Sequence, residues 1–453
     1  MAKTSALAPA ARPRPFRRLI PALAVGAGVA LSGCGGSADD AATAQKGGEA
    51  TPETVTDEQG RTVVKPEQLV LAARKLRTQG QSGKAIQLLS LAIKAKPELA
   101  AAYVERAAIL ADNRLFLKAI KDMDAAVELA PGRAALLTSR GYYHLQQQKY
   151  PAALADFNAA IEADPQFAVA LNNRGLVNVA LQQHGEAIRD FDAAIAAKPD
   201  YADARNNRGF TRIQMDQFDA AIEDFTKVVT DNPNYVSAYN NRGLAHVRSE
   251  RYNEAVEDFT KAIQLAPLQF KHYLHRSRAY EKAGQTDAAK ADLAQVVWLQ
   301  KLGKLNRAVS ADPASVANLL ERSRHFADAG RFDAALADTE RAAKASPSAP
   351  EPLTGKARVL LAAGKLAEAK AACEASLALG PLNETYSIRG DVHMQSGDFD
   401  AAIADFNAAG RFDSDVAQAY VRRAEQSRAA GDIQQASADM RQAAAIDPQI
   451  RLQ

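Results

Sequence analysis

The stretch ALNNRG at residues 170–175 returns as ARNNRG at residues 204–209 and as AYNNRG at residues 238–243. The three copies stand 34 residues apart. Prolines repeat at the same interval over most of the chain: Pro97, Pro131, Pro165, Pro199, Pro233 and Pro267, and then Pro313, Pro347 and Pro381. A constant period of this length indicates a repeat protein, in which each unit packs on the next.

Small residues recur within the period, and two antiparallel helices can cross closely only where their side chains are small. An alanine stands twelve residues before each of these prolines except Pro313, and a glycine or another small residue stands twenty-four before most of them. Eight residues before the proline, an aromatic side chain is expected to fill the space between one hairpin and the next: Phe157, Phe191, Phe225 and Phe259. These spacings predict one helical hairpin per period.

The pattern resembles the tetratricopeptide repeat, which has a small residue at position 8, alanine at 20 and 27, an aromatic near 24 and proline at 32. Eleven repeats fit the chain, starting at residues 66, 100, 134, 168, 202, 236, 270, 316, 350, 383 and 417. The resemblance implies an all-α fold, an α-solenoid of about eleven helix-turn-helix repeats in a right-handed superhelix. Its concave groove is expected to be lined mainly by the first helix of each repeat.

The phase of the repeats slips by twelve residues between the seventh and the eighth, around LGKLNRAVSADP. We therefore assign residues 65–301 to repeats one to seven, residues 302–315 to an insertion, and residues 316–453 to repeats eight to eleven. The insertion is expected to be either a lengthened second helix or a loop. Trp298, the only tryptophan of the chain, stands beside it and is expected to pack at this seam.

The N-terminal residues carry no repeat. The basic stretch RPRPFRR precedes an apolar run, LIPALAVGAGVA (residues 19–30), which is too short to span a membrane and is typical of an export signal. It ends on LSGC (residues 31–34), which resembles the lipobox of bacterial lipoproteins. The resemblance implies removal of residues 1–33 and lipid attachment to Cys34; the alternative is an ordinary signal peptide with an unrelated cysteine. Residues 34–64 lack apolar periodicity and are predicted to be a flexible tether.

Removal of this leader changes the sign of the net charge. The whole chain has a formal charge of +3, but the leader carries five basic and no acidic residues, so the remainder stands at −2. The charge total therefore gives no reason to expect binding to nucleic acid. The other cysteine, Cys373, has no partner, which excludes a disulfide.

Position 7 is arginine in nine of the eleven repeats, and an aspartate follows each of these arginines by sixteen residues. The two repeats without the arginine also lack the aspartate, so the two residues are predicted to form an ion pair within the repeat. Pairing of the aspartate with the arginine of the next repeat would leave Arg106 and Arg389 unpaired. A ladder of arginines that binds an acidic ligand is a further alternative. Among the predicted pairs are Arg174 with Asp190, Arg208 with Asp224, and Arg242 with Asp258.

The asparagines at positions 5 and 6 are expected to face the groove: Asn172, Asn173, Asn206, Asn207, Asn240 and Asn241. Asparagine is unfavourable inside a helix, but its amide offers both a donor and an acceptor to a peptide backbone. Those at position 6 resemble the asparagine ladder of the O-linked N-acetylglucosamine transferases, which implies peptide binding. The alternative is that repeat duplication copied polar residues without a binding role. The Lys and Asn of the two-carboxylate clamp in chaperone-binding repeats are absent.

No catalytic site, metal site or cofactor is predicted. The seven histidines show no metal-binding spacing, and the chain has no phosphate-binding loop or nucleophile motif. His272 and His275 share a helix face without a third ligand, so they are expected to be solvated groove residues. We therefore expect that the protein is not an enzyme.

Together these features predict a lipid-anchored scaffold or adaptor of the bacterial cell envelope that binds partner proteins or extended peptides in its groove. Bacterial lipoproteins of this architecture include adaptors for cell-wall hydrolases and proteases, and pilotins of pilus secretins. The alternative is a structural assembly subunit, pilotin-like or self-oligomerising. The residue after the lipobox cysteine is Gly35 rather than aspartate. This implies an outer-membrane location that faces the periplasm, with membrane contact through the N-terminal lipid.

Overall fold

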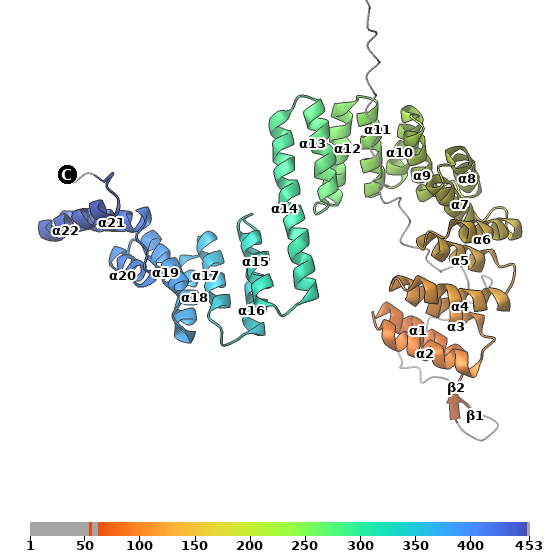
Figure 1. The fold of residues 1–453 in the computed structure, drawn as a ribbon, viewed down its shortest axis with the longest axis horizontal. Helices are drawn as coiled ribbons and strands as arrows, with labels where there is room; N and C mark the ends of the chain where they lie inside the picture. Colours follow the sequence, from red (N-terminus) through yellow and green to blue (C-terminus); the bar gives the residue numbers. More distant parts are fainter. Residues whose placement is uncertain (1–53, 57–61, 451–453) are drawn as a thin grey trace, which may run out of the picture. The chain divides into compact units, whose positions relative to one another are not determined.

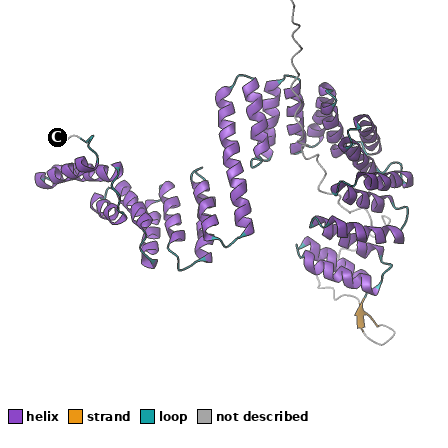
Figure 2. Ribbon diagram, in the orientation of Figure 1, coloured by secondary structure: helices purple, strands orange, loops and turns teal. Residues whose placement is uncertain are grey.

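The computed structural model describes residues 54–56 and 62–450, which are helical apart from one short hairpin (Figure 2). Strands β1 (Thr54–Thr56) and β2 (Thr62–Val64) pair in antiparallel fashion. The tether was expected to lack regular structure here, but its threonines and valines are β-branched and favour strands. The predicted leader, Cys34 and the first part of the tether lie outside the described residues.

The chain divides into two compact units between Asp292 and Leu293. Figure 1 labels the helices of both units. The helices of the first unit are α1 (Pro66–Thr78), α2 (Ser82–Ala95), α3 (Ala100–Asp112), α4 (Phe116–Leu129), α5 (Ala134–Gln146), α6 (Tyr150–Ala163), α7 (Ala168–Ala180), α8 (His184–Ala197), α9 (Ala202–Gln214), α10 (Phe218–Asp231), α11 (Val236–Arg248), α12 (Tyr252–Leu265) and α13 (Phe270–Lys282). Helix α14 (Thr286–Ala311) runs through the boundary. Those of the second unit are α15 (Val316–Ala327), α16 (Phe332–Ala345), α17 (Glu351–Ala362), α18 (Leu366–Leu379), α19 (Asn383–Ser396), α20 (Phe399–Ala409), α21 (Ser414–Ala429) and α22 (Ile433–Ile446).

The helix boundaries follow the predicted repeats closely. Nine of the eleven predicted repeat starts are the first residue of a helix, and the other two fall within three residues of Glu351 and Ser414, where α17 and α21 begin. Odd-numbered helices are therefore the first helices of the repeats and even-numbered helices the second. None of the described helices combines the length and the apolarity needed to cross a membrane.

The two helices of a hairpin pack closely at the point where the first helix crosses the second. A Cβ placed on Gly175 would come within 2.6 Å of Cε1 of Phe191, and one on Gly243 within 2.7 Å of Cε1 of Phe259. The aromatic ring thus lies on the small residue of its own repeat, a contact that sequence reasoning had not included. Phe157 also packs with Val177 of the following repeat, as expected.

The size of the two crossing residues is matched along the chain. Glycine at position 8 always accompanies phenylalanine at position 24, whereas alanine or serine accompanies a smaller side chain such as leucine, methionine, threonine or cysteine. The glycine pairs are Gly141–Phe157, Gly175–Phe191, Gly209–Phe225, Gly243–Phe259 and Gly390–Phe406. Close packing explains the match, because the ring occupies the volume that a Cβ would need.

The phase slip between the seventh and eighth repeats lies in a lengthened second helix. Of the two predicted alternatives, the helix is therefore right and the loop is wrong. Helix α14 has 26 residues, whereas the second helices of the preceding repeats have 14. Its added residues include the predicted insertion up to Ala311. The division into compact units falls earlier, inside the same helix.

Trp298 lies in α14 and packs within the second unit, in the place expected for it beside the seam. Its indole stacks on the ring of His325 at 5.0 Å between centroids, and the guanidinium of Arg331 lies 4.4 Å from its ring centre. The indole N–H donates to the His325 carbonyl at 3.3 Å. These contacts occupy the tryptophan inside the protein.

Candidate functional site

The arginine and the aspartate of each repeat meet as bidentate ion pairs. Arg242 donates from Nη2 to Oδ1 of Asp258 at 2.7 Å and from Nε to Oδ2 at 2.9 Å. The pairs Arg174–Asp190 and Arg208–Asp224 have the same arrangement. The aspartates are at most 6% exposed, so an arginine must neutralise them inside the hairpin.

Seven of the nine arginines also bind the preceding repeat through a residue sixteen positions earlier, a contact that sequence reasoning missed. Arg174 donates from Nη1 to Oδ1 of Asn158 at 2.9 Å, and Arg242 donates to the hydroxyl of Thr226 at 3.1 Å. The acceptor stands sixteen residues before the arginine and is a polar side chain in every such contact: Ser90, Asp124, Asn158, Asp192, Thr226, Thr260 and Asn306. The polar residue that recurs at this spacing is the sequence feature that could have predicted the contact between repeats.

These contacts give the positively charged arginines partners within the protein, so no ligand is needed to balance them. The hydrogen bonds that Arg106 donates to Asp122, and Arg276 to Asp292, raise the pKa of both arginines above the ordinary value, against the opposing effect of burial. Eight of the nine guanidinium groups are held by protein oxygens on two sides, and Arg389 is held by Asp405 alone, which disfavours a ladder of arginines for an acidic ligand.

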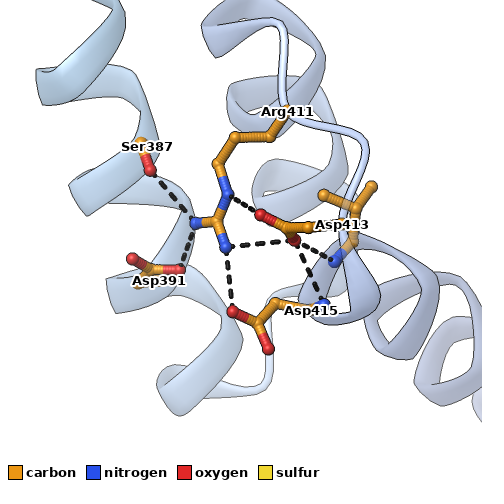
Figure 3. A network of polar contacts seen from close by, with 6 residues as sticks. Ser387, Asp391, Arg411, Asp413 and Asp415 are labelled. Atoms are coloured by element: carbon orange, nitrogen blue, oxygen red, sulfur yellow. Dashed lines mark hydrogen bonds and ion pairs between the residues drawn. The ribbon is translucent and has the colours of Figure 1, made fainter.

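A different arginine closes the tenth repeat, as Figure 3 shows. Arg411 reaches from the loop between α20 and α21 to Asp391 at 2.7 Å, Asp413 at 2.8 Å and Asp415 at 2.9 Å. Asp413 also accepts from the backbone N–H groups of Asp415 and Val416 and so caps α21. The network fixes the turn between α20 and α21, where α20 has only 11 residues.

The predicted groove asparagines bind one another across repeats. Asn207 donates to Oδ1 of Asn172 at 3.0 Å, and Asn241 donates to Oδ1 of Asn206 at 3.1 Å. Position 6 of one repeat therefore contacts position 5 of the repeat before it. Weaker contacts join the two asparagines within α7 and within α11.

Four of the six amides are buried rather than exposed to solvent. Asn172, Asn173, Asn206 and Asn207 are at most 5% exposed, and only Asn240 and Asn241 are half-buried. Two buried amide atoms, Nδ2 of Asn173 and Oδ1 of Asn207, have no hydrogen-bond partner within the described part of the chain. Peptide binding by the six asparagines stays a prediction, because the geometry shows only their contacts with one another.

His275 continues this series of contacts in the seventh repeat. Its Nδ1 lies 2.8 Å from Oδ1 of Asn240, and Nδ1 of His272 lies 3.1 Å from the same oxygen. The two histidines are half-buried and bonded, so the prediction that they are solvated is wrong. Burial, followed by the charges of His272, Arg278 and Lys271, lowers the pKa of His275 to about 4.

This pKa predicts a loss of stability in mild acid. The unfolded chain binds the His275 proton below about pH 6.5, whereas the folded chain stays neutral there until about pH 4. The contribution of neutral His275 to the stability of the folded protein is therefore complete above about pH 6.5 and falls as the pH is lowered. Between about pH 7.5 and pH 5 we expect a loss of roughly 2 kcal/mol from this residue.

Urea unfolding of the wild type and of His275→Asn at the two pH values measures this loss. Asparagine is the residue at the same position in the preceding repeat, Asn241, and it does not titrate. We expect the variant to lose less stability than the wild type on acidification. Equal losses in the two proteins would contradict the role given to His275.

The second unit contains a groove that is not filled by its own side chains. A cavity of about 350 Å³ lies between α15 and α17, with α19 at its edge. Leu320 and Val359 contribute apolar side chains to its lining, and Arg324 and Arg358 line the same cavity. Arg358 forms an ion pair with Glu384, whereas the side chain of Arg324 has no hydrogen bond or ion pair to any described residue.

No group of three side chains suited to metal binding occurs among the residues that the structure describes.

Comparison with known proteins identifies the repeat. Tetratricopeptide repeat family models match residues 138–209, 202–235, 236–267, 320–384 and 384–415. No curated protein matches the chain.

Several solved structures are similar to parts of the chain. MamA from Desulfovibrio magneticus is 21% identical, with a TM-score of 0.35, and covers 37% of this chain and 95% of its own. YrrB, described as a TPR protein with an unusual peptide-binding site, is 24% identical, with a TM-score of 0.33 and coverage of 41% and 95%. A tetratricopeptide repeat protein from Parabacteroides merdae is 20% identical, with a TM-score of 0.38 and coverage of 55% and 93%. The matched repeats and the helical hairpins together show that this chain is an all-α solenoid of tetratricopeptide repeats.

Proposed function

We propose that this protein is a lipid-anchored scaffold of the cell envelope that binds partner proteins through the first-helix face of its repeats. One observation supports this function above all. The groove between α15 and α17 is not filled by its own side chains, and the exposed Arg324 in its lining has no partner among the described residues. A side chain without an internal partner, in a cavity of about 350 Å³, favours contact with an external molecule.

The sequence of the leader supports the anchor. Its basic stretch, apolar run and LSGC ending are the features of a lipoprotein signal peptide. We propose that diacylglycerol is attached to Cys34 after cleavage. Stable anchoring needs two acyl chains, since each buried CH₂ contributes about 0.8 kcal/mol. The proposed location is the outer membrane, with the repeats in the periplasm, and we propose neither a reaction nor a cofactor.

Detergent-phase partition tests the anchor directly. The wild type is expected to enter the detergent phase and to label with a radioactive fatty acid, whereas Cys34→Ala is expected to do neither. Cys373→Ala is the matched control, because this buried cysteine stands outside the leader. Unchanged partition of Cys34→Ala would remove the anchor from the proposal.

A structural assembly subunit remains the alternative function. Exposed apolar side chains on second helices, such as Leu117 and Leu91, favour it because they offer surface to a second copy. Sedimentation of the chain without its leader separates the two functions. A monomer supports the scaffold, and a defined oligomer supports the assembly subunit.

A further inference from the structure

The N-terminal half of α14, which is the second helix of the seventh repeat, exposes apolar side chains that are buried in other repeats. Leu293 stands at position 24 and is 46% exposed, whereas this position is at most 1% exposed in every other repeat but the last. Val297 stands at position 28 and is 67% exposed, whereas its counterparts Val229 and Ile263 are 7% and 8% exposed. The last repeat has no successor to cover it. Exposure of the same positions on α14 therefore indicates that a following first helix is missing there.

The phase slip explains why this helix is missing. Asn306 accepts a hydrogen bond from Arg322, sixteen residues later, so the C-terminal half of α14 contacts α15 as a second helix contacts the next repeat. In that register residues 282–294 would be the first helix. They form instead the last residue of α13, the turn after it and the start of α14. One first helix is thus absent beside α14.

The C-terminal half of α14 is basic at a position where the repeats are acidic. Position 23 in its register is Lys304, whereas nine repeats have an aspartate there that pairs with the arginine of their own first helix. Between Leu293 and Ala311 the helix carries Lys301, Lys304 and Arg307 and no acidic residue. All three basic side chains are exposed, and none forms a hydrogen bond or ion pair with a described residue.

We propose that a helix of a partner protein docks on α14 in place of the missing first helix. The docking surface consists of Leu293, Val297, Lys301 and Lys304, which the helical period places on one side of α14 and which we call the α14 face. The partner helix packs an apolar stripe on Leu293 and Val297. An acidic residue about two turns further along it pairs with Lys304.

The spacing of the apolar residues favours a helical partner. Leu293 and Val297 are four residues apart, and no other two large exposed apolar side chains of the described chain are three or four apart. Such a pair forms a stripe along one side of a helix, which is the surface that a second amphipathic helix covers.

The charge of the α14 face favours an external partner over a second copy of this chain. In nine repeats the first helix supplies an arginine at position 7, and the second helix supplies the aspartate that answers it. On the α14 face the second helix supplies Lys304, so an arginine at the same place would meet a like charge. An acidic helix meets an opposite charge instead. The inference goes beyond the proposed function, because this surface lies on a second helix.

Selection from a library of helix-stabilised peptides, with the full-length protein in detergent as bait, tests the proposal. We expect enrichment of sequences that have two apolar residues three or four apart and an Asp or Glu about two turns away. Val297→Asp and Lys304→Glu in the protein are each expected to weaken binding of the best peptide about tenfold or more.

Matched variants separate binding from folding. Leu379→Asp on α18 and Lys344→Glu on α16 change exposed residues of the same unit away from the α14 face and are expected to leave binding unchanged. Lys304→Glu is expected to bind the peptide again when the acidic residue of the peptide is replaced by Lys. A folding defect cannot produce this recovery. Thermal melting of each variant checks that the repeats stay folded.

The possible outcomes separate this inference from the proposed function. Enriched peptides whose affinity does not respond to Val297→Asp and Lys304→Glu overturn the inference and agree with binding at the first-helix face. An oligomer of the protein that Val297→Asp dissociates also overturns it, because a second copy then covers the α14 face. Absence of any enriched peptide overturns it as well, and the scaffold function is then decided by cross-linking on the first-helix face.

Discussion

Replacing Asp258 by alanine is expected to destabilise the first unit by about 3–5 kcal/mol, because it leaves the guanidinium of Arg242 without its carboxylate. The side chain of Asp258 is 5% exposed and that of Arg242 is 20% exposed, so water cannot substitute fully for the lost partner. Arg242 keeps its hydrogen bond to the hydroxyl of Thr226 and its contact with the Tyr239 ring, neither of which supplies a negative charge. Urea unfolding of the wild type and the variant measures the loss.

A double-mutant cycle with Arg242→Ala shows whether the two residues act as a pair. The double variant is expected to be no less stable than the worse single variant, with a coupling energy of roughly 2 kcal/mol or more. Purely additive losses would contradict the pairing. Glu186→Ala is the matched control: its pair with Arg189 has side chains 53% and 74% exposed, and the expected loss is below about 0.5 kcal/mol.

Replacing Gly175 by alanine is expected to destabilise the fourth repeat by about 1–3 kcal/mol, although alanine is the better helix former. The new Cβ would come within 2.6 Å of the Phe191 ring, which is fully buried and cannot move aside. Gly185→Ala in α8 is the control, because no atom lies within 4 Å of its Cβ position. That substitution is expected to stabilise the protein by up to about 1 kcal/mol.

A second substitution should repair the first. In the second repeat, alanine at position 8 faces methionine at position 24, as Ala107 and Met123. Phe191→Met in the Gly175→Ala background is therefore expected to recover part of the stability. Thermal unfolding of the four proteins tests this, and equal losses from Gly175→Ala with either residue at position 191 would show that the ring is not the obstacle.

The repeats could be predicted from the sequence because their signals are local. Proline, alanine and small residues at fixed positions mark the ends and the crossing points of each hairpin, and the helices begin where that period places them. The pairing of Arg242 with Asp258 could also be predicted, since the two residues are lost together in the repeats that lack them.

Contacts between repeats were harder to predict, because they depend on how neighbouring helices are offset. Asn207 and Asn172 are 35 residues apart and therefore stand at different positions of their repeats. A comparison of the repeats at one position does not reveal this contact. The same holds for the bond from Arg242 to Thr226. The cavity between α15 and α17 depends on how these helices pack, so its lining could be found only from side-chain coordinates.

Photo-cross-linking in cells tests the central claim, that partners bind the first-helix face. A photoreactive residue replaces Arg278 on α13 or Glu321 on α15, and, as controls, Glu223 on α10 or Glu374 on α18; all four side chains are exposed. Asn207 is unsuitable because it is fully buried. We predict discrete protein adducts from the first-helix positions and none from the controls. Equal adducts from both sets, or adducts from the second helices alone, would contradict the account.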